Sequence, residues 1–265
     1  MPVARIQSIT ERWAQIIRLE LEEPFQFAAG QYLEIEHPSG TRIPLSIASA
    51  PHRLPRLELH YRSTPGDDLA ALLDGLLQKG RTLDLCGPFG DVIVTTLEAV
   101  SKRDRFWGAH GRATIFRRTM GGFRRKPWSK NARTAFLRPL IESPLMLVAG
   151  GTGISQALSI IEHIDQLLSP PAVTLLWCVD TAEALYARGQ LAGLSWLSAN
   201  YLVDDRRTSD NEGLVWLSEH LRTHAYARTL LCGGPSFVYA VVDHLRAEQR
   251  MTALESDVFA YSPKG

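Results

Sequence analysis

The hydrophobic periodicity changes near the middle of this chain of 265 residues, and the change restricts the folds open to it. Over residues 2–96, apolar residues occur in short, partly alternating runs separated by turn residues, which indicates antiparallel strands. From residue 143 onwards, continuous apolar runs of strand length alternate with helical patterns, which is typical of a parallel sheet. We therefore expect two domains of different class.

The first half is expected to form an antiparallel Greek-key β-barrel. Its predicted strands are ARIQSIT, WAQIIRLEL, QYLEIEH, LSIAS, LELHYR and TLDLCG, and Pro and Gly residues mark the turns between them. One helix is predicted over residues 67–78, where leucines recur at helical spacing.

The second half is expected to be a doubly wound parallel α/β domain. Its predicted strands are PLMLVAG, AVTLLWCV and TLLCG, and its predicted helices are TGISQALSIIEHIDQLL, TAEALYARGQL and PSFVYAVVDHLRAEQR. Right-handed crossovers bring the carboxyl ends of such strands to one edge, where ligands bind.

A strongly basic segment separates the two halves. Twelve Lys or Arg residues and one acid lie between residues 101 and 141, so the rest of the chain carries a net charge of −10. The predicted organisation is therefore a barrel domain at 1–98, a basic insert at 99–142 and an α/β domain at 143–265. The insert also carries six Phe or Trp residues. It could be a surface excursion without a role, a docking surface for an acidic protein, a single-strand nucleic-acid binder or a frame-shifted stretch; nucleic acid is not the expected partner.

Composition limits the remaining classes. No apolar run reaches the ~18 residues of a membrane span, and the first residues lack a secretory signal pattern, so a cytoplasmic protein without a membrane span is expected. The three cysteines are far apart, which supports neither a disulfide framework nor a metal site. Redox chemistry would need an organic cofactor.

Two glycine-rich turns follow predicted strands of the second half. The sequence VAGGTGIS at residues 148–155 lets the backbone approach a pyrophosphate at a helix start, through Gly150, Gly151, Thr152 and Gly153. The sequence LLCGGPSF at residues 230–237 supplies Cys232, Gly233, Gly234 and Pro235, which would face a nicotinamide. Tight packing alone could also explain such glycines.

Four blocks in this order resemble the ferredoxin-NADP reductase superfamily: FQFAAGQYLEIE, PLSIASAP, VAGGTGIS and LLCGGP. Within it the chain looks most like the bacterial NAD(P)H:flavin oxidoreductases, because LSIASAP followed by LELHYR, and the tail SDVFAYSP, recur there in similar form. The resemblance covers residues 24–97 and 143–261. It implies a flavin, either FAD or FMN, in the barrel and NADH or NADPH on the second domain.

The resemblance also implies roles for individual residues. Ser46 would lie beside flavin N5, where its hydroxyl can donate to or accept from that atom. Alternatively, Ser46 only satisfies a barrel strand. The other residues assigned to the flavin are Pro44, Leu45, the backbone of Ile47, Ala48 and Ser49, and His60 and Arg62 in LELHYR.

The chain departs from the family at its phosphate-binding positions. The family usually has arginine three residues before the serine, but this chain has Ile43 there and Arg42 one position earlier. An offset of one residue turns a strand side chain to the opposite face, so Arg42 would reach a flavin phosphate only through a bulge. The second phosphate block, at residues 64–68, offers acids. Both departures favour flavin as an exchangeable substrate.

Three further residues have two interpretations each. Asp180 could accept from the ribose hydroxyls and repel a 2′-phosphate, which favours NADH, or it could cap the next helix with Thr181. Cys232 could lie beneath the nicotinamide, or be a small buried residue. The aromatic rings of Phe259 and Tyr261 could stack on the flavin, or complete an edge strand.

The predicted activity is transfer of a hydride from NADH or NADPH to flavin N5, with reduced flavin leaving to serve an oxygenase, ferric iron or oxygen. A rival of the same fold is a reductase subunit that keeps FAD and donates electrons to a separate ferredoxin or oxygenase. A rival of another class is a non-catalytic flavin or nucleotide sensor that acts through the insert.

Overall fold

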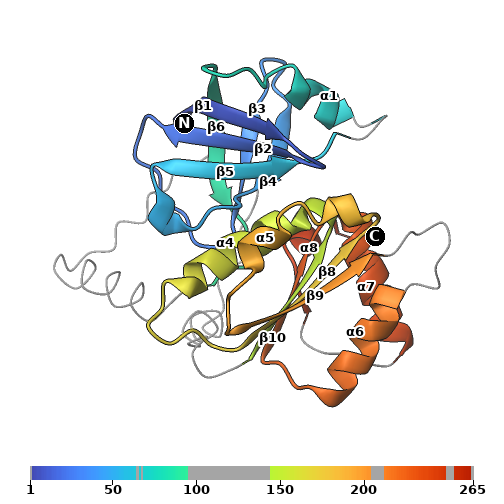
Figure 1. The fold of residues 1–265 in the computed structure, drawn as a ribbon. Coiled ribbons are helices and arrows are strands. Elements are labelled where there is room, and N and C mark those ends of the chain that lie inside the picture. Colours follow the sequence, from blue (N-terminus) through green and yellow to red (C-terminus); the bar gives the residue numbers. More distant parts are fainter. Residues whose placement is uncertain are drawn as a thin grey trace, which may run out of the picture.

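The computed structural model describes residues 2–63, 66, 68–94, 144–203, 212–248 and 254–263. They form two domains, one above the other in Figure 1, each built on one β-sheet. The basic insert and the predicted boundaries at 98/99 and 142/143 lie outside the described residues.

The N-terminal domain is a six-stranded antiparallel sheet with strand order β4-β3-β6-β1-β2-β5. A bridge between Ile47 and Leu59 joins the two edges of this sheet, next to a hydrogen bond from the Ala48 amide to the Glu58 carbonyl. The elements are β1 (Val3–Glu11), β2 (Gln15–Leu21), β3 (Tyr32–Glu36), β4 (Arg42–Ser46), the 3₁₀ turn η1 (Pro51–Arg53), β5 (Arg56–Tyr61), α1 (Asp68–Asp74) and β6 (Thr82–Phe89).

Strand alternation explains why this sheet forms. In β2, Ile17, Leu19 and Leu21 are buried in the domain core while Arg18 and Glu20 are exposed. Successive side chains of a strand point to opposite faces, so the face that carries these apolar residues is buried in the core. The predicted helix at residues 67–78 forms α1, which is shorter than expected.

The C-terminal domain is a five-stranded parallel sheet with strand order β11-β10-β7-β8-β9. Helices α4 and α5 lie on the face toward the N-terminal domain, and α6 and α7 lie on the other face (Figure 1). The elements are β7 (Leu145–Gly150), η3 (Gly151–Gly153), α4 (Ile154–Asp165), β8 (Val173–Val179), η4 (Ala182–Ala184), α5 (Arg188–Leu191), β9 (Leu197–Val203), α6 (Glu212–Thr223), β10 (Arg228–Cys232), α7 (Pro235–Ala247), β11 (Leu254–Glu255) and α8 (Val258–Tyr261).

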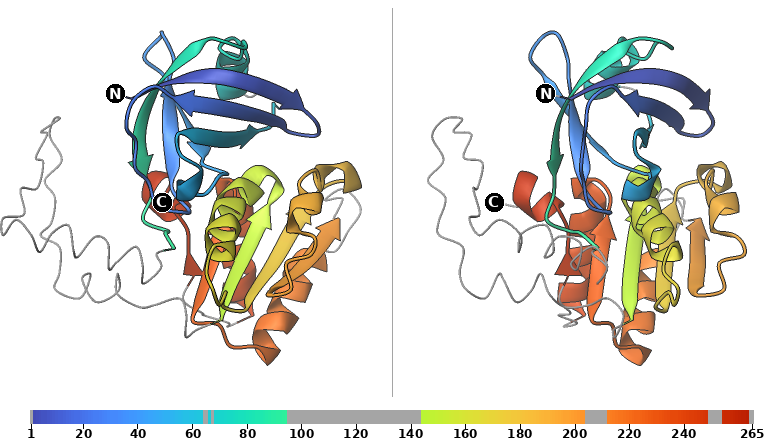
Figure 2. Two further views of the ribbon diagram at one scale, coloured as in Figure 1. Left: turned by 60° about the vertical axis from the view of Figure 1, so that its left-hand side comes forward. Right: turned by 90° about the vertical axis from the view of Figure 1, so that its left-hand side faces the viewer.

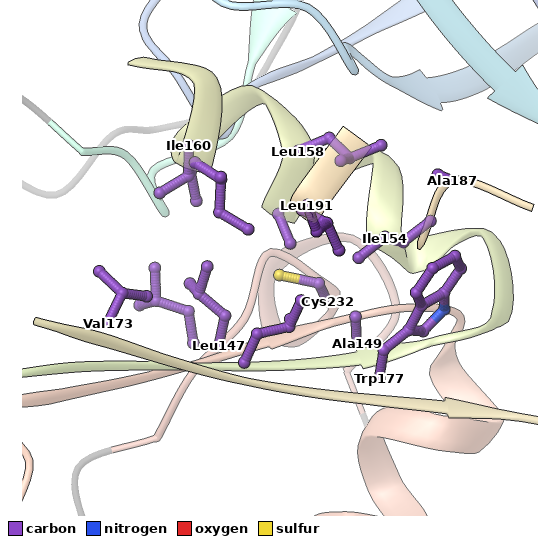
Figure 3. Packing of buried hydrophobic residues seen from close by; sticks show 14 of the residues in the cluster. Leu147, Ala149, Ile154, Leu158, Ile160, Val173, Trp177, Ala187, Leu191 and Cys232 are labelled. Carbon is purple, nitrogen blue, oxygen red and sulfur yellow. The ribbon is translucent and has the colours of Figure 1, made fainter. Parts of the chain in front are cut away.

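The central sheet is buried on both faces. On one face, Leu147 lies below Ile160 of α4 and Trp177 lies beside Ile154 of the same helix, as Figure 3 shows. On the other, Val148 packs with Val238 of α7. Strand β7 therefore reads as one continuous apolar run. The first of these clusters continues into the N-terminal domain through Ala14, Ile16, Ala29, Val92 and Val94, so the two domains share part of one core.

The helix predicted from TAEALYARGQL is wrong as a single element. The structure has the short turns η4 and α5, which Tyr186 separates. Tyr186 is buried there and its hydroxyl contacts His60 of the other domain, so a tertiary contact overrides the helical pattern. No helix within the described ranges combines the length and the apolar character needed to cross a bilayer.

Candidate functional site

A cavity of about 180 Å³ lies between the two domains. Its walls come from the N-terminal sheet, from both glycine-rich turns and from the segment after β11. Pockets that hold a whole ligand usually measure about 300–1,000 Å³, so this cavity would enclose only part of a bound ligand and the rest would lie outside it. The lining residues are Tyr32, Pro44, Leu45, Ser46, His60, Thr152, Gly153, Ser155, Gln156, Gly233, Gly234, Ser256, Asp257 and Val258.

One helix sets the position of the two domains. Figure 2 shows α4 directly beneath the N-terminal sheet. Gln156, Ser159 and Glu162, spaced three residues apart on α4, face that domain. Gln156 and Ser159 donate to the carbonyl oxygens of Gly30 and Ser49 at 2.7 and 2.8 Å, and Glu162 accepts from the amide of Ala50 at 2.7 Å. These contacts fix the cavity that the domains enclose.

The two glycine-rich turns pack directly against each other. A Cβ on Gly153 would lie 2.2 Å from the carbonyl oxygen of Cys232, and one on Gly150 would lie 2.4 Å from the ring of Phe237. Gly151 has a φ of +53°, which favours glycine. Packing and backbone geometry therefore explain these three glycines. Around Gly234, by contrast, a Cβ would meet nothing within 4 Å, and this residue lines the cavity.

The PLSIAS segment reaches the cavity at its beginning only. Pro44, Leu45 and Ser46 line the cavity, as do His60, Thr152, Gly153, Gly233 and Gly234 among the other predicted residues. The backbone of residues 47–49, also expected at the flavin, is not among the lining residues of this cavity. The amides of Ile47 and Ala48 donate to Gln31 and Glu58, and Ser49 Oγ accepts from the Glu58 amide.

Arg42 lies away from the cavity. Its guanidinium is 3.7 Å from the carboxylate of Glu34 and 3.9 Å from that of Glu36, on the exposed side of β4. Ile43, at the family's arginine position, is buried in the core. Neither residue offers a positive charge to a phosphate in the cavity. Most of the second phosphate block lies outside the described residues.

His60 is buried between two polar partners. Its Nε2 lies 2.9 Å from Glu58 Oε1, and its Nδ1 lies 3.0 Å from the hydroxyl of Tyr186. Burial alone would raise the pKa of Glu58, but the hydrogen bond and charge of His60, with the charge of Arg18, outweigh burial and lower it. Burial raises the pKa of the Tyr186 phenol. Glu58 is therefore a carboxylate that anchors the imidazole beside the cavity.

Arg62 and Asp180 contact each other across the domain interface. Arg62 Nη1 donates to Asp180 Oδ2 at 3.0 Å, and the guanidinium lies 3.8 Å from the ring centroid of Trp13. Thr181, the residue before η4, makes no side-chain hydrogen bond that caps this turn. Asp180 and Arg62 are not among the lining residues of the cavity, so the structure brings together two residues that had been assigned to different ligands.

Cys232 does not reach the cavity surface. Its side chain is fully buried among Leu147, Ala149 and Trp177, and Figure 3 shows the sulfur within this cluster. Burial, with a smaller contribution from the charge of Asp257, raises the pKa of the thiol. Its burial supports the interpretation of Cys232 as a small buried residue.

Asp257 is a cavity residue that the sequence reasoning missed. Its carboxylate accepts from the amides of Asp91 and Val92 at 2.9 and 3.2 Å and from Gln156 Nε2 at 3.0 Å. Burial raises its pKa, although these hydrogen bonds act in the opposite direction. A sequence signal for Asp257 exists, because this acid lies inside the motif SDVFAYSP that carries part of the resemblance. The sequence could not tell that the segment after β6 would supply amides to it.

Pro235 and Phe259 are not among the residues that line the cavity. Pro235 is the first residue of α7, where its missing N–H costs nothing. Phe259 is 37% exposed on α8, with its ring 6.1 Å from that of Tyr239. The side chain of Tyr261 lies outside the described residues. The tail ends in the helix α8 after β11, so the alternative of an aromatic edge strand is wrong for Phe259. Among the described residues no cluster of His, Cys, Asp and Glu could hold a metal ion.

Comparisons with known proteins agree with this architecture. No family model matches the chain. It is 27% identical to a probable flavin reductase of Aliivibrio fischeri, over 92% of this chain and 90% of that protein. It is 24% identical to reductase component 2 of the terephthalate 1,2-dioxygenase of Comamonas sp, over 94% of this chain but only 64% of the relative's length. Its fold matches that of the Amycolatopsis cytochrome P450 reductase GcoB with a TM-score of 0.68 at 22% identity, over 96% of this chain and 68% of that one. The chain is therefore similar in sequence to proteins named flavin reductase and dioxygenase reductase component, and it shares the two-domain fold of GcoB.

Proposed function

We propose that this chain is an NAD(P)H:flavin oxidoreductase whose cavity brings a nicotinamide and a flavin ring together. The observation that carries the proposal is the shared cavity: Ser46 of the N-terminal sheet and both glycine-rich turns of the C-terminal domain line one space. Relatives named as flavin reductases and as dioxygenase reductase components support an NAD(P)H-dependent reductase. An FAD is named in a structural neighbour of this chain, a flavohemoglobin.

The hydrogen-bond donors and the apolar walls of the cavity fit a flavin ring and a nicotinamide nucleotide. Pro44, Leu45 and Tyr32 supply an apolar wall for a flat ring, and Ser46 adds a hydroxyl at its edge. The open space beside Gly234 allows a ring to approach the backbone closely. The amide groups at the start of α4 are suited to a pyrophosphate.

The cofactors would supply the redox chemistry: a two-electron hydride passes from dihydronicotinamide C4 to flavin N5. The chain's own contribution is proximity and orientation, because the two walls of the cavity belong to different domains that α4 holds in one arrangement. The Ser46 hydroxyl would donate a hydrogen bond to N5 of an oxidised flavin and accept one from N5–H of a reduced flavin. His60, anchored by Glu58 and Tyr186, fixes a polar edge of the cavity.

Flavin is proposed to bind as an exchangeable substrate. The carboxylates of Glu34 and Glu36 lie within 4 Å of the Arg42 guanidinium and weaken its attraction for a flavin phosphate, and no Lys or Arg is among the described residues that line the cavity. The reduced flavin would then leave for an oxygenase, ferric iron or oxygen. The second candidate is a reductase that keeps FAD and donates to a separate ferredoxin or oxygenase, and the dioxygenase relatives favour it. In that case the basic insert at residues 101–141 is a candidate docking surface for an acidic partner.

Two measurements test these candidates. Oxidation of NADH and of NADPH is followed at 340 nm with added FMN, FAD or riboflavin, and the purified protein is passed through gel filtration. Turnover that depends on added flavin, with a colourless protein after filtration, supports the first candidate. A yellow protein that reduces an external ferredoxin supports the second. Absence of nucleotide oxidation under every condition contradicts both and leaves the sensor.

A further inference from the structure

The ion pair between Arg62 and Asp180 lies at the end of strand β8. Arg62 follows β5 of the N-terminal domain and Asp180 follows β8 of the C-terminal domain. In a doubly wound sheet, an acid at the end of this strand meets the adenosine ribose. Here that acid already accepts a hydrogen bond of 3.0 Å from Arg62. From this contact we infer that the choice between NADH and NADPH is set by the Arg62–Asp180 pair and not by Asp180 alone; the inference rests on the proposed function.

Stacking holds Arg62 beside the first glycine-rich turn. Its guanidinium carbon lies 3.8 Å from the ring centroid of Trp13, in the hairpin between β1 and β2. Trp13 stacks in turn on Tyr186, with ring centroids 6.0 Å apart and an interplanar angle of 16°. A Cβ on Gly151 would lie 3.9 Å from Cη2 of Trp13, so the indole adjoins the turn. Arginine favours such stacked positions, and the stack orients its donors toward the strand end.

The charge balance of the pair determines what the site tolerates. The side chains of Arg62 and Asp180 are 36% and 46% exposed, so a ligand can reach both. Paired, they carry no net charge and admit either nucleotide. An unpaired Asp180 would repel the 2′-phosphate of NADPH, which carries about −1.5 to −2 charges at neutral pH. An unpaired Arg62 would attract it through charge-assisted hydrogen bonds.

A second ion pair across the interface provides a matched control. Arg53 Nη1 donates to Glu162 Oε1 at 2.8 Å, and their side chains are 50% and 30% exposed. This pair also joins the two domains, but Glu162 lies eight residues along α4 from its first residue, roughly 12 Å from the helix start. If loss of an ion pair alters nucleotide binding only by weakening the domain interface, variants of both pairs should show the same change.

The test compares two adenine nucleotides that differ only in the 2′-phosphate. Binding of 5′-ADP and 2′,5′-ADP to the full chain is measured by titration calorimetry, for the wild type and for Arg62→Gln and Asp180→Asn. We expect the ratio of the two dissociation constants to shift about tenfold toward 5′-ADP in Arg62→Gln and about tenfold toward 2′,5′-ADP in Asp180→Asn. Arg53→Gln and Glu162→Gln should leave the ratio unchanged. The NADH and NADPH values of kcat/KM should shift in the same directions.

Failure of the inference about Arg62 and Asp180 can be distinguished from failure of the proposed function. If both nucleotides bind and the ratio is the same in the wild type, Arg62→Gln and Asp180→Asn, the pair only joins the domains and the inference is overturned, while the proposed function stands. If the wild type binds neither nucleotide, the proposed nucleotide site is contradicted as well. Thermal melts check that each variant folds, and Arg62→Met, which removes the charge but keeps a long side chain over Trp13, replaces Arg62→Gln if that variant fails to fold.

Discussion

Gly153 and Cys232 touch so closely that a Cβ on Gly153 would lie 2.2 Å from the Cys232 carbonyl oxygen. Because both partners are backbone, neither can yield by rotating a side chain. We expect Gly153→Ala to lower the free energy of unfolding by about 2–3 kcal/mol, since the two turns must separate. Urea unfolding followed by tryptophan fluorescence measures this, and a midpoint equal to that of the wild type would contradict the packing seen here.

Gly234 gives the opposite expectation. Its φ of −71° and ψ of 164° suit alanine, and a Cβ there enters open space. Gly234→Ala should leave the urea midpoint within about 0.5 kcal/mol of the wild type. It should raise the KM for NADH severalfold, because the methyl group occupies space that the nicotinamide needs. An unchanged KM would mean that the ring does not approach this residue.

Ser46→Ala should slow hydride transfer about tenfold, because it removes one hydroxyl that acts at N5, a loss of ~1.4 kcal/mol in the transition state. The dissociation constant for NADH should stay nearly constant. Rapid mixing of enzyme, flavin and NADH separates the two quantities. Ser39→Ala, in the turn between β3 and β4, is the control. A wild-type transfer rate in Ser46→Ala would remove Ser46 from the proposed mechanism.

Glu58 should make stability depend on acidity. Its pKa is lowered in the folded chain, so its stabilising contribution is present above the pKa of an unfolded glutamate and is lost as the pH falls through the folded value. Between about pH 5 and pH 3, the wild type should therefore lose stability more steeply than Glu58→Gln. Urea titrations at several pH values measure the slopes, with Glu20→Gln on the exposed side of β2 as control. Parallel slopes for the wild type and Glu58→Gln would show that the carboxylate is not stabilised by its neighbours.

Deletion of residues 102–138 should leave turnover with added flavins largely intact. The described residues on either side of the insert approach each other at Arg228, whose side chain donates to the Ile93 carbonyl at 3.0 Å and whose Cα pairs with Leu145. A short linker can therefore span the gap at small entropic cost. Loss of soluble expression would mean that the segment belongs to the core. Loss of activity toward a protein acceptor alone would support a docking role.

Periodicity predicted most of the architecture, because sheet class depends on patterns that the chain carries locally. The alternation in β2 is typical of an antiparallel sheet and the apolar run of β7 is typical of a parallel sheet, and each strand lies in a sheet of the expected class. Strand β9 was not predicted, since it is an edge strand whose residues are mostly half-buried and partly polar. Edge positions weaken the pattern that sequence reasoning uses.

The candidate site was predicted less completely than the fold. Ser46 and the glycine-rich turns could be found because each lies in a local motif. The burial of Ile47 depends on its pairing with a strand of the same sheet. The pairing of Arg62 with Asp180 joins segments more than a hundred residues apart in the sequence. No local pattern encodes those distances, so they required the structure.

The polar stripe on α4 has a consequence for how such proteins diversify. Gln156, Ser159 and Glu162 bind main-chain atoms of the opposite domain, and every sequence with that backbone offers the same atoms. The side chains of Ser49 and Ala50 take no part in this docking, whereas residue 30 must stay glycine, because its φ is +101° and a Cβ would lie 2.4 Å from the Val92 carbonyl oxygen. A chimera that joins this helix to the flavin lobe of a distant relative should therefore assemble in the native orientation.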